Sequence, residues 1–188
     1  IGPLTKDVRD AALILGVIDG HDPKDSTSAD IPVQDYTESL GKSIRGMKIG
    51  KPKEYFSSGL HQGLQKRMDE SLGVLRSLGA EIVDVSLPHT QYSVNVYYIV
   101  APSEASSNLA RFDGVRFGHR DRASATLSDM YEKTRGEGFG AETKRRIILG
   151  TYCLSSGYYD AYYLRAMKVR TKIKHDFDEA FKKVDAIL

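Results

Sequence analysis

Hydrophobic positions recur every three or four residues near the start of the chain, the spacing of a helix with one apolar face. The spacing predicts a first helix over residues 5–16, with Thr5 as its N-cap and Gly20 placed to end it in a left-handed conformation. The stripe consists of Val8, Ala11, Ala12, Leu15 and Ile18. A polar connector follows from His21 to Gly46, and its Asp, Ser and Pro residues favour turns over regular structure.

The stretch from residue 47 to residue 87 has the order strand, helix, strand. Met47 and Ile49 alternate with polar residues, and Gly79 ends the helix that comes next. That helix places Leu64, Met68, Leu72, Leu75 and Leu78 on one face. A second strand holds Ile82, Val83, Val85 and Leu87 and is closed by Pro88. This order predicts a βαβ unit at about 47–87, with two parallel strands.

The second half of the chain is predicted to be rich in helices. A helix from Tyr92 aligns Tyr98, Ala101, Ala105, Leu109 and Phe112, with Pro102 expected to kink it or to start a new one. Further helices are expected over 128–134, 142–154 and 158–183, and the Gly-rich run 136–140 is expected to break the chain. The last helix has a stripe of Tyr159, Tyr162, Ala166, Val169, Ile173, Phe177, Ala180 and Val184. The fold class is therefore α/β.

The composition is that of a soluble globule, with 40% hydrophobic residues and a net charge of +2. The charge is uneven, because residues 111–188 carry 16 Lys and Arg against 11 Asp and Glu. An exposed basic face is expected on the last helix, at Arg165, Lys168, Arg170, Lys172 and Lys174. Such a face is either a solvated helix surface or a contact for an anionic partner such as nucleic acid.

The chain has one cysteine and no apolar run long enough for a membrane span, so a cytoplasmic protein without membrane contact is expected. Its first twenty residues lack the order of a signal peptide. The chain starts with Ile1 rather than Met, and the apolar run Val184 to Leu188 is followed by no turn signal. We therefore expect an internal segment of a longer protein.

Few residues form a pattern that points to catalysis. The histidines are scattered without the i, i+4 spacing of a helical metal site, and no P-loop is found. Ser39 and Lys42 match the short S-x-x-K pattern, but a pattern with two free positions arises easily by chance. Cys153 lies in an apolar helical stretch, which predicts a buried, inert thiol. No metal site and no complete nucleophile-and-base set are predicted.

One stretch, residues 142–170, combines basic residues with tyrosines. Lys144, Arg145 and Arg146 are followed by Tyr152, Tyr158, Tyr159, Tyr162 and Tyr163. Phenols and guanidinium groups suit a polar or anionic ligand. The alternative is that the tyrosines pack between helices with their hydroxyls at the rim.

Several motifs resemble those of the A subunits of aspartyl/glutamyl-tRNA amidotransferases, the glutaminase branch of the amidase signature family. The resemblance covers essentially the whole chain. It rests on residues Ile1 to Thr5, Gly20 to Ala29, Ser103 to Gly114, Gly136 to Gly140, Lys144 to Ile147 and Ser156 to Tyr163. The first of these is shared with other amidase signature enzymes, and the later ones are particular to the tRNA-dependent branch.

The resemblance implies a segment, residues 1–188, of a single amidase domain with a mixed sheet and helices on both faces. In the family a lysine and two serines form the catalytic triad, and all three lie upstream of the segment that Ile1 begins. The family's acidic contact for the glutamine amino group lies beyond Leu188. The resemblance therefore implies no catalytic residue in this segment and no activity of the segment alone.

Two positions match family residues that hold glutamine, namely Tyr97 and Arg146. Arg146 would pair with the α-carboxylate, and Tyr97 would add a directed hydrogen bond. The open alternatives are that Tyr97 or Tyr98 belongs to the core, and that Arg145 rather than Arg146 faces the ligand.

The resemblance also implies partners. The intact protein would hydrolyse glutamine through an acyl-enzyme and pass ammonia to the B subunit of the complex, which uses ATP and Mg²⁺ to amidate misacylated Glu-tRNA(Gln) or Asp-tRNA(Asn). The small C subunit would bridge the two in a heterotrimer. The alternatives are another amidase signature hydrolase, or a basic nucleic-acid-binding module.

Overall fold

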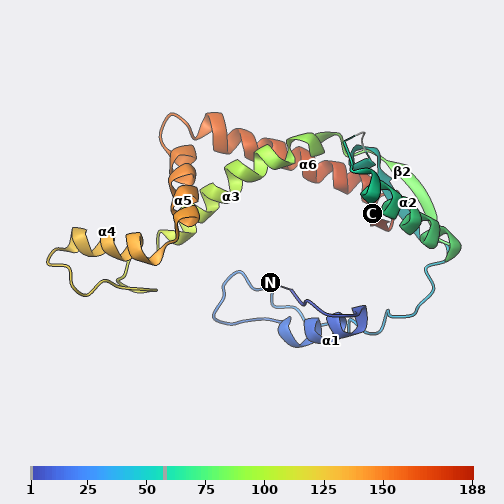
Figure 1. Ribbon diagram of the computed structural model, residues 1–188, viewed down its shortest axis with the longest axis horizontal. Helices are drawn as coiled ribbons and strands as arrows, with labels where there is room; N and C mark the ends of the chain where they lie inside the picture. The colour runs from blue at the N-terminus through green and yellow to red at the C-terminus, as the bar shows by residue number, and fades with distance from the viewer. Residues whose placement is uncertain (1, 57–58) are drawn as a thin grey trace. The chain divides into compact units, whose positions relative to one another are not determined.

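The structure is a computed structural model that describes residues 2–56 and 59–188 (Figure 1). Ile1, part of the first family motif, lies outside the described residues. The chain divides into two compact units, Ile1–Arg45 and Gly46–Leu188. Within the described part of the chain, no helix combines the length and apolar character that a membrane crossing requires.

The first unit contains helix α1, Val8–Ile18, and the irregular connector. Thr5 was expected to cap the helix, but Asp7 does so, because its side chain accepts a hydrogen bond from the Asp10 amide at 2.9 Å. The Thr5 hydroxyl instead donates to the Asp7 carbonyl. Gly20 has a positive φ of +127°, but the helix is capped one residue earlier, at Asp19, whose backbone is extended. The predicted stripe of α1 is not buried within this unit.

The second unit contains a three-stranded parallel sheet with the order β2-β1-β3. Its elements are β1 (Lys48–Pro52), α2 (Gln62–Ser77), β2 (Glu81–Val85) and β3 (Ala186–Ile187). Ile49 lies opposite Ile82 on one side and Ala186 on the other. The predicted βαβ unit is confirmed, and the final apolar run of the chain pairs as a strand.

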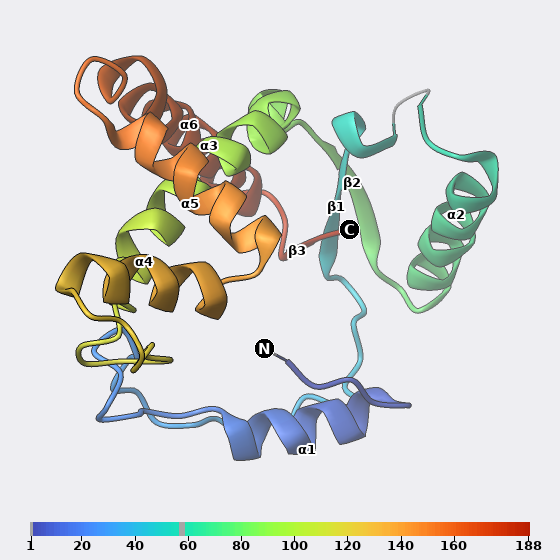
Figure 2. The ribbon, with the colours of Figure 1, turned by 60° about the vertical axis from the view of Figure 1, so that its left-hand side comes forward.

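The core of this unit lies between the sheet and helix α6, Arg165–Phe181. Val85, Leu87, Ala180 and Val184 are buried together there. Figure 2 shows α6 on one side of the strands and α2 on the other. Only Leu72 of the predicted α2 stripe is fully buried, whereas Leu64 and Leu78 are exposed. The stripe predicted for α6 is buried or half-buried from Ala166 onward, because the helix packs against α3 and, near its end, against Val85 and Leu87.

Polar contacts, most of them half-buried, attach α6 and the turn after β1 to the segment that follows β2. The Asp176 carboxylate accepts hydrogen bonds from the His89 amide at 2.8 Å and from its ring Nδ1 at 2.9 Å. Glu54, in the turn after β1, accepts from the Ser86 hydroxyl at 2.6 Å and the Leu87 amide at 2.9 Å. These contacts fix the carboxyl ends of the two strands relative to each other.

The rest of the unit is helical: α3 (Ser93–Leu109), α4 (Leu127–Gly138), α5 (Ala141–Leu154) and a π-helical turn (Asp160–Leu164) that leads into α6. Pro102 lies inside α3 without ending it. The Gly-rich run was expected to break the chain throughout, but Gly136 and Gly138 belong to α4, which is longer than predicted. The break comes at Phe139 and Gly140, which are extended.

Helices α3 and α5 pack very closely (Figure 2). A Cβ atom added to Gly150 of α5 would lie 1.9 Å from the carbonyl oxygen of Pro102 in α3. Ser103 is fully buried, and its hydroxyl donates to the Ile99 carbonyl of the same helix. The predicted face of α3 is therefore wrong. Its buried residues are Val96, Pro102, Ser103 and Ser106, because small side chains with locally bonded hydroxyls allow the approach.

We predict that Gly150→Ala destabilises the protein by more than about 2 kcal/mol, because the new methyl group has no room against the backbone of α3. Urea denaturation measures the change. Gly136→Ala in α4 is the matched control, since a Cβ there meets nothing within 4 Å and should raise stability by up to about 1 kcal/mol. Equal effects of the two changes would contradict the close packing of α3 on α5.

We also predict that Glu54→Gln lowers the free energy of unfolding by about 1–2 kcal/mol near neutral pH. Burial alone would raise the pKa of Glu54, but the hydrogen bonds from Leu87 and Ser86 outweigh it and hold the pKa below its ordinary 4.5. The stabilisation is therefore present above pH 4.5 and is lost as pH falls through the lowered folded-state pKa.

Urea denaturation of both proteins between about pH 3 and pH 7 tests this. The exposed Glu81, changed to Gln, serves as the control, and its difference from the unchanged protein should be small. A constant difference for Glu54→Gln across the whole pH range would refute the role of its carboxylate.

Candidate functional site

The structure brings Tyr97 and Arg146 together, although they are 49 positions apart in the sequence. Tyr97 lies in the second turn of α3 and Arg146 in the second turn of α5. The Nη1 atom of Arg146 donates to the Tyr97 hydroxyl at 3.3 Å. The contact joins the same two helices that meet at Gly150 and Pro102, so their close packing positions both side chains.

Glu142 holds the guanidinium group of Arg146 from the preceding turn. Its Oε1 accepts from Nε of Arg146 at 3.0 Å, and its Oε2 accepts from Nη1 of Arg145 at 2.5 Å. The hydrogen bond to Tyr97, followed by the one to Glu142, raises the pKa of Arg146 above its ordinary value. An arginine side chain is positively charged at any physiological pH, and the contacts to Glu142 and Tyr97 orient the guanidinium group of Arg146.

The two arginines differ in exposure. The side chain of Arg145 is 76% exposed and that of Arg146 is 36% exposed. Arg146 is therefore the more shielded of the two, beside α3, and its role as the arginine that faces the ligand stays a prediction. Tyr97 and Tyr98 stand edge to face, with centroids 5.3 Å apart, and each is about half exposed. Neither tyrosine belongs to the core.

The arrangement has the chemistry of a carboxylate site. A guanidinium group has five N–H donors, and the contacts to Glu142 and Tyr97 use two of them. The remaining donors allow a planar, bidentate pair with a second carboxylate. The Tyr97 hydroxyl, which accepts from Arg146, still has its own proton to donate.

The tyrosines of the same sequence region lie elsewhere. Tyr152 is six residues after Arg146, which is about 240° around α5. It packs against Tyr158 and Tyr162 instead of facing Tyr97. Tyr163 donates a hydrogen bond of 2.8 Å to Glu104 of α3. The expected basic and aromatic stretch is therefore divided between two surfaces.

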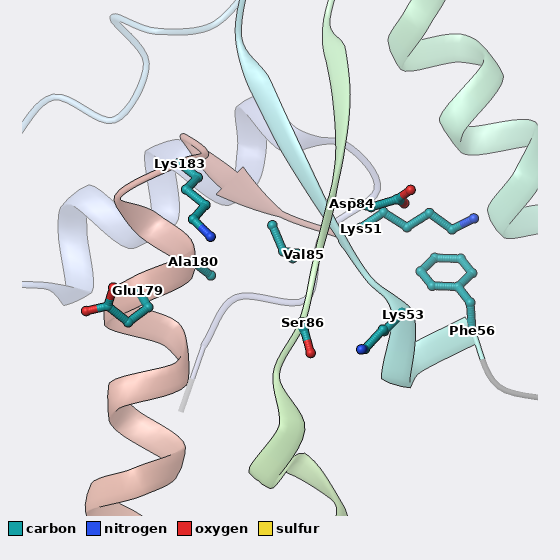
Figure 3. Close-up of a pocket in the computed structure, with 9 residues that line it drawn as sticks. All are labelled: Lys51, Lys53, Phe56, Asp84, Val85, Ser86, Glu179, Ala180 and Lys183. Carbon is teal, nitrogen blue, oxygen red and sulfur yellow. The ribbon is translucent and has the colours of Figure 1, made fainter.

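Sequence reasoning missed one hollow, of about 580 Å³, beside the strand ends (Figure 3). The Lys51 ammonium lies 4.6 Å from the centre of the Phe56 ring, and Asp84 projects on the same side of the strands. Glu179 and Lys183 of the α6 end line the other side. The carboxyl ends of parallel strands are the signal that could have found it. Its cations and carboxylates are mixed, so the hollow shows no clear charge preference.

The remaining sequence candidates show no catalytic arrangement. Cys153 is buried, and burial raises the pKa of its thiol, which confirms the expected inert residue. Ser39 and Lys42 lie in an exposed turn, where the Lys42 amide donates to the Ser39 carbonyl. The contact involves backbone atoms only.

Comparison with known proteins gives a consistent result. The family model described as Amidase matches residues 1–188. The A subunit of glutamyl-tRNA(Gln) amidotransferase from Carboxydothermus hydrogenoformans is 62% identical over 188 residues, 100% of this chain and 39% of that protein. The protein of the same name from Trichlorobacter lovleyi is 61% identical, with the same coverage. The chain therefore spans 39% of the length of these relatives.

Solved structures show the same relationship. The A subunit of glutamyl-tRNA(Gln) amidotransferase from Thermotoga maritima superposes with a TM-score of 0.70 at 37% identity, covering 99% of this chain and 35% of that one. A bacterial aryl acylamidase of the amidase signature enzymes has a TM-score of 0.68 at 24% identity, with the same coverage. The second likeness shows a shared fold alone.

Proposed function

The chain belongs to the amidase family, and we propose that it is a segment of a glutaminase subunit that supplies ammonia for tRNA-dependent amidation. The resemblance drawn from the sequence motifs is confirmed at the level of this family. The names of the similar proteins support the narrower assignment. The observation that carries it is the Tyr97 to Arg146 contact, which pairs the two positions that match the family's glutamine-binding residues.

In this proposal Arg146 binds the α-carboxylate of glutamine through its free N–H donors. Glu142 orients the guanidinium group, so little side-chain freedom is lost on binding. The Tyr97 hydroxyl donates to the same ligand and limits its position. The positive, planar guanidinium group of Arg146 and the directed hydrogen bond from Tyr97 together favour a small amino acid over an amide substrate that has no carboxylate.

The remaining chemistry is assigned to other parts of the longer protein. The catalytic triad of a lysine and two serines, one of which would carry the acyl group, and the acidic contact for the amino group would lie outside residues 1–188. The segment alone is then expected to be inactive and to bind free glutamine negligibly. The coverage of 39% of the relatives' length supports this division.

The proposed partners follow from the same assignment. The B subunit would use ATP and Mg²⁺ to activate misacylated tRNA, and the C subunit would complete a heterotrimer in the cytoplasm. No cofactor and no metal are assigned to this segment. The relatives are named as one lettered subunit of an amidotransferase, which supports a complex with other subunits.

The first experiment is an assay of the full-length protein for ammonia release from glutamine, with an aryl amide as the comparison substrate. Saturable glutamine hydrolysis is the expected result. Hydrolysis of the aryl amide without hydrolysis of glutamine would favour the alternative of a different amidase signature hydrolase.

We predict that Arg146→Ala in the full-length protein raises the KM for glutamine by about 10- to 100-fold, because a charge-assisted contact is lost. Tyr97→Phe, which removes one neutral hydrogen bond, should raise it by about 2- to 10-fold. Steady-state ammonia release measures both, and circular dichroism checks that the fold is retained.

Arg145→Ala is the matched control, since it removes the same side chain one position away, where it is mostly exposed. Its KM should stay within about twofold of the unchanged protein. Unchanged glutamine saturation in Arg146→Ala would refute the binding role, whatever the effect of Arg145→Ala.

A further inference from the structure

Three tyrosines form an exposed cluster where α5 is followed by α6. The ring centres of Tyr152 and Tyr158 are 4.4 Å apart, and Tyr162 lies 5.9 Å from each of them. Their exposed fractions are 44%, 42% and 38%. Large amphipathic rings gathered at the surface are typical of binding surfaces. The glutamine site proposed above does not use them.

Specific backbone geometry builds this cluster. The amides of Tyr158 and Tyr159 both donate to the Ser155 carbonyl, and Gly157 takes a φ of +89° that favours glycine. The π-helical turn Asp160–Leu164 follows, with the Leu164 amide bonded to the Tyr159 carbonyl five residues earlier. Single π-helical turns occur mainly at functional positions, because they cost stability.

Cations follow the tyrosines in the sequence, within α6. Arg165, Lys168 and Lys172 are exposed, and they lie within about 60° of one another around the helix. Among residues 2–56 and 59–188, no carboxylate lies within 4 Å of their charged groups. Asp160 is an exposed carboxylate within the π-helical turn, so positive charge prevails over the surface without being exclusive.

The three tyrosines are uncharged, and their rings pack against one another. The neighbouring Tyr158 hydroxyl, with smaller contributions from desolvation and Tyr162, raises the pKa of Tyr152 to about 12. Bases of single-stranded RNA would need free ring faces for stacking, but here Tyr152 and Tyr158 stack on each other. Tyrosine, serine and glycine together are instead typical of surfaces that bind proteins.

We propose that Tyr152, Tyr158 and Tyr162, together with Arg165, Lys168 and Lys172, form a docking surface for an extended, acidic segment of a partner protein. We call these six residues the tyrosine surface. The rings contact the apolar parts of the segment, and the cations pair with its carboxylates. The inference rests on one part of the proposed function, namely that the full-length protein forms a complex with other subunits.

Photo-crosslinking in the assembled complex tests the proposal. Tyr162→p-benzoyl-L-phenylalanine is introduced into the full-length protein, which is expressed with its partner subunits, irradiated and analysed by mass spectrometry. The expected product joins position 162 to a partner peptide with more Asp and Glu than Lys and Arg. A crosslink to RNA, to the protein's own chain or to a basic peptide, or no crosslink at all, would overturn the proposal.

Charge reversal gives a second, quantitative measurement. Arg165→Glu combined with Lys172→Glu should weaken partner binding at least about tenfold in low salt, with a smaller effect in high salt. Lys174→Glu is the control, because residue 174 lies about 180° around the helix from Arg165 and carries the same charge. Equal weakening by the control and the double variant would count against the tyrosine surface.

Glutamine hydrolysis by the same proteins is measured in parallel. Ammonia release from the charge-reversal variant without partner subunits should equal that of the unchanged protein, since these residues are outside the glutamine site. Loss of partner binding with retained hydrolysis supports the docking surface. Absence of hydrolysis in the unchanged protein would refute the proposed function, and the crosslink would still decide the docking surface.

Discussion

The close approach of α5 to α3 at Gly150 and Pro102 is the contact on which the helical part of the molecule depends. No side chain separates the two backbones there, because a Cβ on Gly150 would overlap the Pro102 carbonyl. Buried Ser103 and Ser106 satisfy their hydroxyls within α3, so the two serines leave no unpaired hydroxyl at the interface. One helical turn away along α5, the same approach lets Arg146 reach Tyr97.

A second constraint connects the helices to the sheet. Helix α6 buries Ala180 near its end against Val85 and Leu87, and Asp176 binds His89 in the segment after β2. The other end of α6 follows the π-helical turn that carries Tyr162 of the tyrosine surface. Because the single helix α6 runs between these regions, a partner bound to the tyrosine surface would contact an element that is attached to the sheet. The two proposed surfaces are therefore parts of one packed unit.

Much of the fold could be predicted from the sequence, because the strands and helices have the hydrophobic periods of their structures. The βαβ unit and the helix from residue 142 to residue 154 are examples. The two errors have different causes. The buried face of α3 was misassigned because Pro102 and Ser103 carry no hydrophobic signal, and the N-cap of α1 was misassigned because Thr5 and Asp7 are both good capping residues.

The sequence by itself determined the fold class, the parallel strands and, through its motifs, the family, and it predicted the two residues of the candidate site. Local periodicity and motif identity are enough for these, since each depends on neighbouring residues. Only the tertiary structure decided that Arg146 rather than Arg145 is shielded, that Glu142 orients it, and that the tyrosines form a separate surface. The shielding of Arg146 depends on how closely α3 and α5 approach, which Gly150 and the buried Ser103 set without any hydrophobic pattern.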